Sequence, residues 1–387
     1  MIAAALPPQL DGIGDYTALM SAALARGGAA RVRLLTAQAD PDPVPGATIQ
    51  TVFSANDPRS VRALLPAVLA DPPDWLLVQY NPFSYGPRGF NPYLAGVLRT
   101  LKRRVPGLRI AVMTHETHVP FTPSDRELTL RFRIMYTWQR PQMKSMAALS
   151  DRLWFSIEPW ADDYRRMMPR KRIAHMPIGS ALPLAEIGAD EARARLGIAP
   201  DEIVVGLFGT IHVSRMMDWI VRAIKVARET AAPRPVRVLY VGPHHQVLRD
   251  VLPPDTPLIA EGPFPPDEVA RRIRAMDLFL SPFIDGVSTR RSSLMAALQH
   301  GIAAVGTSAH HTDSILKSVD GMALLLADTN DPDVFDEQVR RLVRDDALRA
   351  RIGAGARALY DSEFAFSRVA ERMLDIFNEK RDGDNPE

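Results

Sequence analysis

The stretch Pro282-Phe-Ile-Asp-Gly-Val-Ser-Thr-Arg-Arg-Ser-Ser-Leu-Met-Ala-Ala-Leu-Gln-His-Gly301 decides the fold. It follows a short apolar run, Asp277-Leu-Phe-Leu-Ser281, that is typical of a strand. Its polar, glycine-containing loop leads into a helix predicted from about Arg291 to His300. The next apolar run, Ile302-Ala-Ala-Val-Gly-Thr307, is again strand-like. A strand–loop–helix–strand unit of this kind is the building block of a parallel α/β sheet.

The entrance to this helix is a candidate anion site. Free backbone N–H groups and the positive end of the helix dipole point at the loop. Arg290 and Arg291 can add charge-assisted hydrogen bonds to a phosphate. The alternative is a capped helix with solvated arginines, because Ser and Gly are common at helix starts. The small and polar residues here are Gly286, Ser288, Ser292 and Ser293.

Composition limits the function classes. The chain has 387 residues, of which 46% are hydrophobic and 24% charged, and this length suggests two domains. A net charge of +2 argues against a nucleic-acid partner. The chain contains no cysteine, so disulfides and thiolate metal sites are excluded and a cytoplasmic location is expected. We find neither a signal-peptide pattern nor an apolar run of about 18 residues.

The first half alternates strands with helices. After the first apolar run, Asp11-Gly-Ile-Gly-Asp-Tyr-Thr17 is expected to form a glycine-rich loop, with a helix following to about Arg26. Gly12 and Gly14 would let the backbone approach a ligand, although a simple tight turn explains them equally well. The short first strand leaves open a start further upstream. Strands are predicted at residues 2–6, 31–36, 74–80, 108–114, 151–156 and 172–176.

Two loops follow strands at the edge where ligands of open α/β sheets bind. The first is Asn81-Pro-Phe-Ser-Tyr-Gly-Pro-Arg-Gly-Phe90, and the second begins with His115-Glu-Thr-His118. The two histidines are three residues apart in a loop, whereas a His-Glu-x-x-His zinc motif needs a separation of four on a helix. We therefore expect no metal here, and His115 is either an active-site polar group or a satisfied loop histidine.

Residues 123–148 are predicted to be helical and rich in basic side chains. Pro141 should interrupt or kink this helix. The basic face could lie on anionic lipid, but a solvated face is favoured because the apolar side must also serve the core. The basic residues are Arg126, Arg131, Arg133, Arg140 and Lys144.

The second half repeats the pattern after a linker at residues 177–188. Gly209-Thr-Ile-His-Val-Ser-Arg215 is a second glycine-containing loop between a strand and a helix. Strands are predicted at residues 203–208, 236–242, 258–262, 277–281, 302–307 and 322–326. We expect an N-terminal Rossmann-like domain at residues 1–180 and a second at 181–365. Residues 366–387 should form a helix that packs back on the first domain, followed by a frayed tail.

These motifs together resemble the GT-B glycosyltransferases, and most closely the glycosyltransferase 4 group. They are the Gly-Ile-Gly-Asp-Tyr-Thr loop, the His115-Glu116 pair, the Gly-Thr-x-His-x-x-Arg loop, and Asp285-Gly-Val-Ser-x-Arg-Arg-x-Ser-Leu before Ala-Leu-x-His-Gly301. The resemblance covers nearly the whole chain, and the order of the motifs is more specific than any one of them. It implies two Rossmann-like domains that face each other across a cleft.

The resemblance implies a nucleotide-diphosphate sugar donor of UDP or GDP type, held mainly by the second half, and no other cofactor. Asp15, Gly12 and Gly14 would face the diphosphate or the acceptor, and His115 would lie by the transferred sugar. The second-half loop contributes Gly209, Thr210, His212 and Arg215, with Arg215 aimed at the diphosphate. Gly262 and Phe264 would lie by the base, and Asp285 to Ser293 would bind phosphates and sugar hydroxyls.

The chain departs from the family in places. Thr210 stands where arginine is common, and Ser288 and Ala296 occupy the positions of a usual Glu-x7-Glu pattern. Asp285 and the two arginines would then hold the donor in part. Because cations and a helix N-terminus can stabilise the leaving group, we expect transfer without a metal.

The resemblance implies retention of the sugar's configuration by front-face attack, with catalytic roles for His115, Glu116, Asp285 and Arg215. An inverting enzyme would need a base, for which Asp15 and Glu116 are the candidates. The acceptor is a glycan, a lipid-linked molecule or a small molecule, and peripheral contact with the inner membrane face is compatible with the slightly basic charge.

Three other classes compete with this prediction. A non-catalytic nucleotide- or sugar-binding protein can have the same fold. A nicotinamide oxidoreductase lacks support because neither half carries Gly-x-Gly-x-x-Gly. A serine hydrolase lacks support because no Gly-x-Ser-x-Gly elbow is present.

Overall fold

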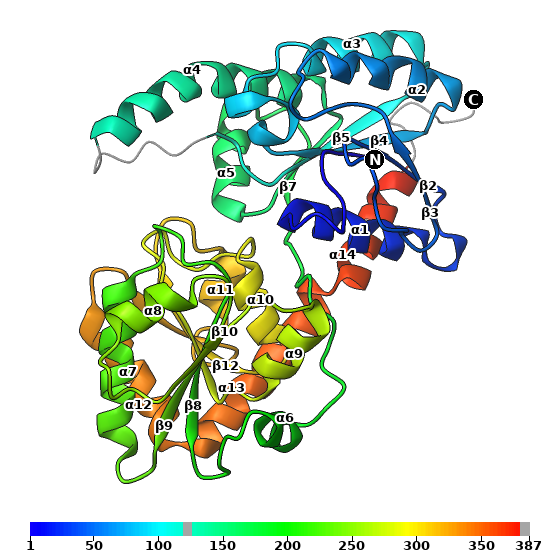
Figure 1. Ribbon diagram of the computed structural model, residues 1–387. Helices are drawn as coiled ribbons and strands as arrows, with labels where there is room; N and C mark the ends of the chain where they lie inside the picture. The colour runs from blue at the N-terminus through cyan, green and yellow to red at the C-terminus, as the bar shows by residue number, and fades with distance from the viewer. Residues whose placement is uncertain (119–125, 380–387) are drawn as a thin grey trace. The chain divides into compact units, whose positions relative to one another are not determined.

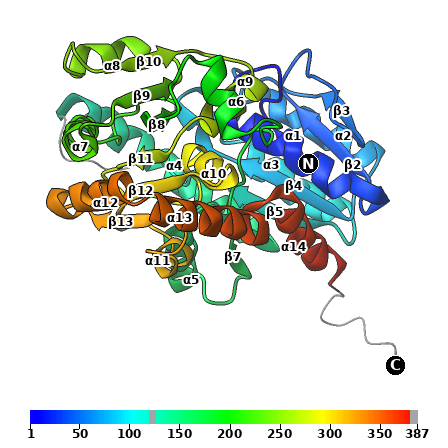
Figure 2. The same ribbon diagram turned by 90° about the horizontal axis from the view of Figure 1, so that it is seen from below.

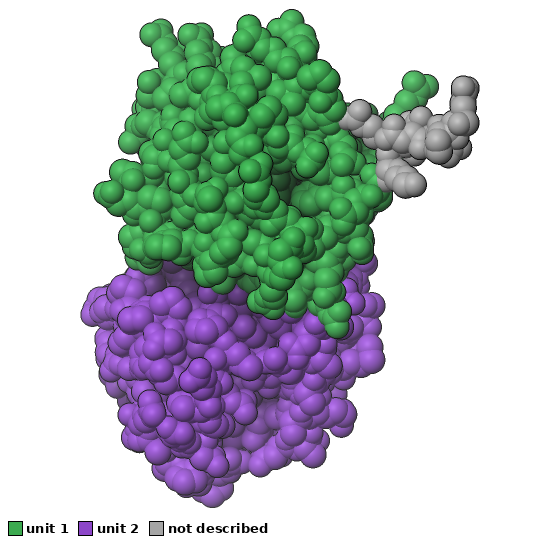
Figure 3. Space-filling view, turned by 90° about the vertical axis from the view of Figure 1, so that its right-hand side faces the viewer, with its two compact units in different colours: residues 1–177, 366–387 green, residues 178–365 purple. Residues whose placement is uncertain are grey.

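The computed structural model describes residues 1–118 and 126–379. Within it the chain forms two compact units (Figure 3). The first comprises residues 1–177 together with the C-terminal segment from residue 366, and the second comprises residues 178–365. Each unit is a parallel sheet covered by helices, so the expected α/β fold of two doubly wound units is confirmed.

The first unit is built on a seven-stranded sheet in the order β3-β2-β1-β4-β5-β6-β7, with every pair parallel. In the centre, Val78 lies opposite Val112, and both are fully buried. Strands covered on both faces need such continuous apolar runs. The strands are β1 (Ile2–Ala3), β2 (Val32–Thr36), β3 (Ala47–Thr51), β4 (Trp75–Tyr80), β5 (Arg109–Thr114), β6 (Arg152–Phe155) and β7 (Ile173–His175).

The C-terminal helix α14 (Phe366–Asn378) packs against α1 within this unit (Figure 1). The ring centroid of Phe377 lies 5.0 Å from that of Trp75 and 5.8 Å from that of Trp154. The indole N–H of Trp75 donates to the backbone carbonyl of Phe377 at 3.1 Å. The other helices of this unit are α1 (Gly12–Ala25), α2 (Leu64–Ala70), α3 (Leu94–Arg104), α4 (Arg126–Leu149) and α5 (Glu158–Met167).

The second unit has a six-stranded parallel sheet in the order β10-β9-β8-β11-β12-β13. The order reverses between β8 and β11, which is the switch point where ligands of such sheets bind. The strands are β8 (Ile203–Phe208), β9 (Val236–Val241), β10 (Leu258–Glu261), β11 (Leu278–Ser281), β12 (Ala303–Ser308) and β13 (Leu325–Asp328).

Helices cover both faces of the second sheet. Helices α7 and α12 lie side by side on one face (Figure 1 and Figure 2), where Trp219 meets Phe335 edge-on at 5.4 Å. The helices are α6 (Ala189–Arg195), α7 (Met217–Ala231), α8 (His245–Val251), α9 (Pro266–Arg274), α10 (Ser292–Gln299), α11 (Ser314–Ser318), α12 (Pro332–Arg344) and α13 (Asp346–Leu359). Among the described helices, none combines the length and the apolar character that a membrane crossing needs.

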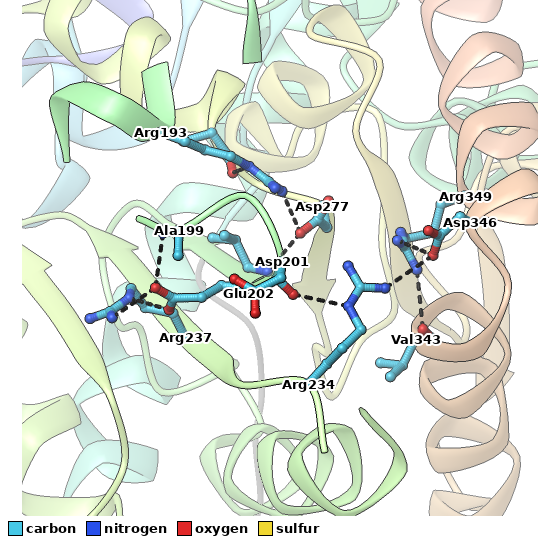
Figure 4. Close-up of polar contacts among 12 residues, drawn as sticks. Arg193, Ala199, Asp201, Glu202, Arg234, Arg237, Asp277, Val343, Asp346 and Arg349 are labelled. Carbon is cyan, nitrogen blue, oxygen red and sulfur yellow. Dashed lines mark hydrogen bonds and ion pairs between the residues drawn. The ribbon is translucent and has the colours of Figure 1, made fainter. Parts of the chain in front are cut away.

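Ion pairs hold together the amino ends of the strands in this sheet (Figure 4). Glu202, which precedes β8, accepts two hydrogen bonds from Arg237 of β9 at 2.6 and 3.0 Å. Asp277, which precedes β11, accepts from the N–H of Val204 at 2.7 Å and pairs with Arg193. These charges lie at the edge opposite the carboxyl ends of the strands, so they serve the fold and leave the other edge for a ligand.

The structure corrects several local predictions. Asp11–Thr17 is not a loop before a helix, because α1 already begins at Gly12 and Asp11 is its N-cap. Strand β3 was not predicted, because it lies at the edge of the sheet and its mostly exposed residues form no continuous apolar run. The predicted strand at 322–326 begins only at Leu325. Helix α4 runs through Pro141 to Leu149 without interruption, while residues 123–125 and the tail from residue 380 lie outside the described residues.

Candidate functional site

Three glycines meet at the carboxyl ends of neighbouring strands in the second unit. A Cβ atom on Gly242 would lie 2.6 Å from the carbonyl oxygen of Gly209, and one on Gly262 would lie 3.1 Å from the backbone N of Gly242. Gly209 has φ +93 and its carbonyl accepts from the Tyr240 hydroxyl at 2.9 Å. Only glycine allows these backbones to approach so closely, and the result is an open edge built from main chain.

The N-terminus of α10 belongs to the same edge. A Cβ atom on Gly209 would lie 3.7 Å from the Cβ of Ser293 in the first turn of α10. No side chain caps this helix at Arg291, and the first helical bond runs from the N–H of Met295 to the Arg291 carbonyl. The N–H groups of Ser292 and Ser293 are therefore directed at the edge without a capping side chain, as an anion site requires.

The loop before α10 is held rigidly by backbone contacts. Gly286 has φ +82, and a Cβ atom there would lie 2.3 Å from the Thr312 hydroxyl. The N–H of Val287 donates to the Thr307 carbonyl at 2.7 Å. Ser288 is fully buried, and its hydroxyl has no hydrogen-bond partner among the described residues. A buried polar atom of this kind is satisfied only when something else binds beside it.

Asp285 is the centre of a charged cluster in this loop. Its Oδ1 pairs with Nη2 of Arg291 at 2.5 Å, and its Oδ2 with Nη2 of Arg290 at 3.3 Å and Nδ1 of His311 at 3.2 Å. Burial alone would raise the pKa of Asp285, but the hydrogen bond from His311 and the charges of Arg291 and Arg290 hold it well below its ordinary value. Asp285 is thus a carboxylate that orients two guanidinium groups.

Arg215 reaches the same place from the loop after β8. It is 6% exposed, and its Nη2 donates to the Phe208 carbonyl at 3.0 Å. The guanidinium carbons of Arg215 and Arg291 lie 5.2 and 3.9 Å from the centroid of the Phe283 ring. Burial lowers the pKa of Arg215 to about 10, with Arg291 contributing, so it remains a cation at neutral pH. Its Nε has no partner among the described residues.

The other predicted residues of the second unit surround this edge. Thr210 is exposed, and His212 bonds through Nδ1 to the Ser214 hydroxyl at 3.0 Å. The ring of Phe264, two residues beyond Gly262, lies 4.0 Å from the guanidinium carbon of Arg272. Phe283 and Gly242 were not predicted as site residues, although a glycine directly after an apolar strand is a signal that could have identified Gly242.

The predicted residues of the first unit gather at the start of α1 and the end of β5. The ring of Tyr16 meets that of His115 edge-on at 5.0 Å. The side chain of Asp11 accepts from the N–H of Gly14 at 2.7 Å, so this glycine serves the cap and the close packing of the helix. Nothing lies within 4 Å of a Cβ atom on Gly12. Burial, followed by the charge of Asp11, raises the pKa of Asp15.

His115 is buried and already hydrogen-bonded. It is 5% exposed, and its Nε2 lies 2.8 Å from Oε1 of Gln79. Burial lowers its pKa to about 3, so the ring is neutral at physiological pH. The satisfied-histidine alternative fits this environment, whereas Glu116, the next residue, is half-buried. Because its pKa is lowered so far by burial, His115 is a poor general base.

Within residues 1–118 and 126–379, no group of three or more histidine, aspartate or glutamate side chains is placed to hold a metal ion. The basic face predicted on α4 is exposed at Arg133, Arg140 and Lys144. The side chains of Arg126 and Arg131 lie outside the described residues.

Comparison with known proteins agrees with this geometry. Residues 202–345 match the family model of the glycosyl transferases group 1. This match lies entirely within the second unit. All the elements of the candidate edge, from Gly209 to Ser293, fall inside this match. No curated protein is similar enough in sequence to match the chain.

Solved structures share the fold over nearly the whole chain. Sucrose-phosphate synthase from Thermosynechococcus elongatus superposes with a TM-score of 0.67 at 16% identity, over 97% of both chains. WaaG, a glycosyltransferase involved in lipopolysaccharide biosynthesis, gives 0.61 at 13% identity over 98% of this chain and 99% of its own. HepE from Anabaena, solved in complex with UDP-glucose, gives 0.61 at 13% identity over 97% of both. The fold is GT-B, and together with the match to the group 1 family model it supports a glycosyltransferase.

Proposed function

We propose that this chain transfers a sugar from a nucleotide-diphosphate donor, of UDP or GDP type, to an acceptor hydroxyl. The carrying observation is the convergence of Arg215, Arg290 and Arg291 with the uncapped start of α10 at one sheet edge. Cations and helix amides in this arrangement stabilise a departing phosphate. The UDP-glucose bound to HepE makes uridine the first base to test.

The same observation supports transfer without a metal ion. Breaking the bond between sugar and diphosphate places negative charge on the leaving oxygen, which a metal or fixed cations must stabilise. The guanidinium groups of Arg215 and Arg291 lie on one phenylalanine ring, and Arg215 stays a cation at neutral pH, so the chain itself supplies fixed cations. We infer that chelation of divalent ions leaves the rate unchanged.

We further propose that the sugar keeps its anomeric configuration. Inversion needs a base beside the acceptor hydroxyl. In the first unit His115 is buried and hydrogen-bonded to Gln79, so only the carboxylates of Asp15 and Glu116 remain as predicted candidates for this base. With retention, the departing phosphate itself takes up the acceptor's proton and the bond to the new oxygen forms on the same face. NMR of the product's anomeric proton distinguishes the two outcomes.

A thermal-shift screen against UDP, GDP, ADP and their sugars tests donor binding. At a concentration of about 100 times Kd, a ligand stabilises the folded state by about 2.7 kcal/mol, or about 5–10 °C for a unit of this size. A response to one nucleotide identifies the base. The absence of any response would favour a protein that binds no donor.

Substitution of the arginines tests the site. Arg215→Ala and Arg290→Ala should each lower kcat/KM by about 10²–10³-fold, as loss of a charge-stabilising group does. Arg340→Ala removes a partly exposed arginine of α12 that pairs with Glu337, and it should leave turnover unchanged. Normal turnover in both site variants, with the fold intact by circular dichroism, would exclude this assignment.

A further inference from the structure

The first unit contains an apolar cavity that none of the predicted site residues enters. It has a volume of about 320 Å³ and lies between the loop after β4, the start of α3 and the second half of α4. Its wall is aromatic, with Tyr80, Tyr85, Phe90 and Trp138, and none of its described lining residues carries a charge. Phe90 and Trp138 meet edge-on at 5.9 Å, and Phe90 is 46% exposed, so part of its ring faces solvent.

The wall is preorganised by hydrogen bonds between the loop and α4. The carbonyl of Arg88 accepts from the indole N–H of Trp138 and from Nε2 of Gln139, both at 3.2 Å. The next carbonyl, of Gly89, accepts from Nε2 of Gln142 at 2.7 Å. Arg88 has φ 55, a left-handed conformation that is costly for a side chain with a Cβ. These contacts fix the loop against the helix, so the wall of the cavity is formed without an occupant.

The polar groups of the wall are already used inside the protein. The amide of Asn91 donates to the Tyr85 carbonyl at 2.5 Å and accepts from Tyr93 and Leu94, both at 2.9 Å. Both ends of the Gln142 amide are bonded, since its Oε1 accepts from the N–H of Asn91 at 2.6 Å.

The hydroxyl groups of the wall follow the same pattern. Those of Thr137, Ser145 and Tyr85 donate to backbone carbonyls at 2.6, 2.9 and 2.7 Å. A sugar, with many hydroxyl groups, would therefore find few partners here.

One polar group differs. The hydroxyl of Tyr80 is buried and has no hydrogen-bond partner among the described residues, in a side chain that is 3% exposed. Burial raises the pKa of Tyr80, so it stays a neutral hydroxyl. The cavity thus offers mainly aromatic faces to an occupant, together with the unpaired hydroxyl of Tyr80.

We propose that this cavity binds an uncharged aromatic group, the aglycone of the acceptor. The identification of this molecule as the acceptor rests on the proposed function, whereas its binding to the cavity does not. Aromatic walls favour an aromatic guest through edge-to-face and stacked contacts. The volume is at the lower end of ligand pockets, with room for a small ring system rather than a long lipid chain. Since the described lining residues carry no charge, a phosphate or a carboxylate is disfavoured.

Direct binding tests the proposal. We expect 2-naphthol to bind the full-length protein at pH 7, measured by isothermal titration, and n-decanol and methyl glucoside to bind at least tenfold more weakly. Ser145→Phe, which places a ring in the cavity, should weaken naphthol binding at least tenfold. Lys144→Phe is the matched control, because the neighbouring side chain is exposed and does not line the cavity. Should Ser145→Phe not fold, Ala95→Leu narrows the cavity from α3.

The outcomes separate this inference from the donor proposal. Tighter binding of n-decanol or methyl glucoside, or equal naphthol binding in wild type and the cavity variants, overturns the aromatic site. The nucleotide thermal shift is measured on the same proteins and depends on the second unit. If naphthol binds while no nucleotide does, the donor proposal fails and the cavity stands as a binding site.

Discussion

Replacement of Asp285 by asparagine tests whether a buried carboxylate orders the arginines of the second unit. Its side chain is 13% exposed, and those of Arg290 and Arg291 are 20% and 15% exposed. Removal of one partner from a fully buried pair costs about 3–5 kcal/mol. Because both guanidinium groups keep some contact with water, and asparagine retains one acceptor, we expect about 2–3 kcal/mol. This corresponds to a fall in the melting temperature of roughly 4–12 °C for this unit.

The contribution of Asp285 to the stability of the folded state should depend on pH. The pKa of Asp285 is held below its ordinary value in the folded state, so its contribution is complete above the unfolded pKa of about 4. As the pH falls further, the unfolded chain takes up the proton first and the contribution decreases. The difference in free energy of unfolding between wild type and Asp285→Asn should therefore be constant from about pH 5 to 7. It should decrease progressively as the pH falls below about 4.

Urea unfolding of both proteins at several pH values measures this gap. Asp361→Asn is the matched control, because Asp361 pairs with Arg357 across a surface where both side chains are more than one third exposed. Such a pair contributes about 0–1 kcal/mol. Equal destabilisation by the two substitutions, or an Asp285→Asn gap that does not change with pH, would refute the account of this cluster.

Three further predictions concern the glycines and His115. Gly286→Ala should destabilise the second unit by about 2–4 kcal/mol in urea unfolding, because φ is +82 and the added Cβ would lie 2.3 Å from the Thr312 hydroxyl. Gly12→Ala should be neutral or stabilise by up to about 1 kcal/mol, since nothing lies within 4 Å and alanine favours the helix; a loss above 1 kcal/mol would contradict a helical Gly12. Burial lowers the pKa of His115 to about 3, so wild type should lose about 2 kcal/mol more stability than His115→Gln between pH 7 and pH 5. An equal loss in the two proteins would show that the ring titrates normally.

The strands were predictable because parallel strands covered on both faces must be apolar throughout. Ile203–Phe208 is such a run, and its residues are almost entirely buried. Strand β3 escaped prediction because it lies at the edge of its sheet and exposes most of its side chains, so no apolar run was required of it. At α1, Gly12 and Gly14 suggested a loop. The N-cap Asp11 was the stronger signal, because its carboxylate satisfies an N–H group that the helix leaves free.

The candidate site was predictable only one loop at a time. The Pro282–Gly301 stretch indicated an anion-binding helix start, and α10 does begin there without a cap. No local pattern could reveal that Asp285 also meets His311, which is 26 residues away, or that Phe283 lies against two guanidinium groups. These contacts depend on how β11 and β12 are aligned, and register is a property of the whole sheet.

The charge at this edge explains how a donor could be held without the usual carboxylates. Ser288 and Ala296, which the resemblance aligns with the Glu-x7-Glu pattern, are both fully buried, and a carboxylate at either would add negative charge to this edge. Instead, Asp285 faces the arginines, and with Arg215, Arg290 and Arg291 it leaves two net positive charges. A nucleotide diphosphate sugar carries about one negative charge per phosphate, or about two in all. Since Asp285 already neutralises one guanidinium, the cluster matches the diphosphate in charge and avoids three mutually repelling cations in the absence of a ligand.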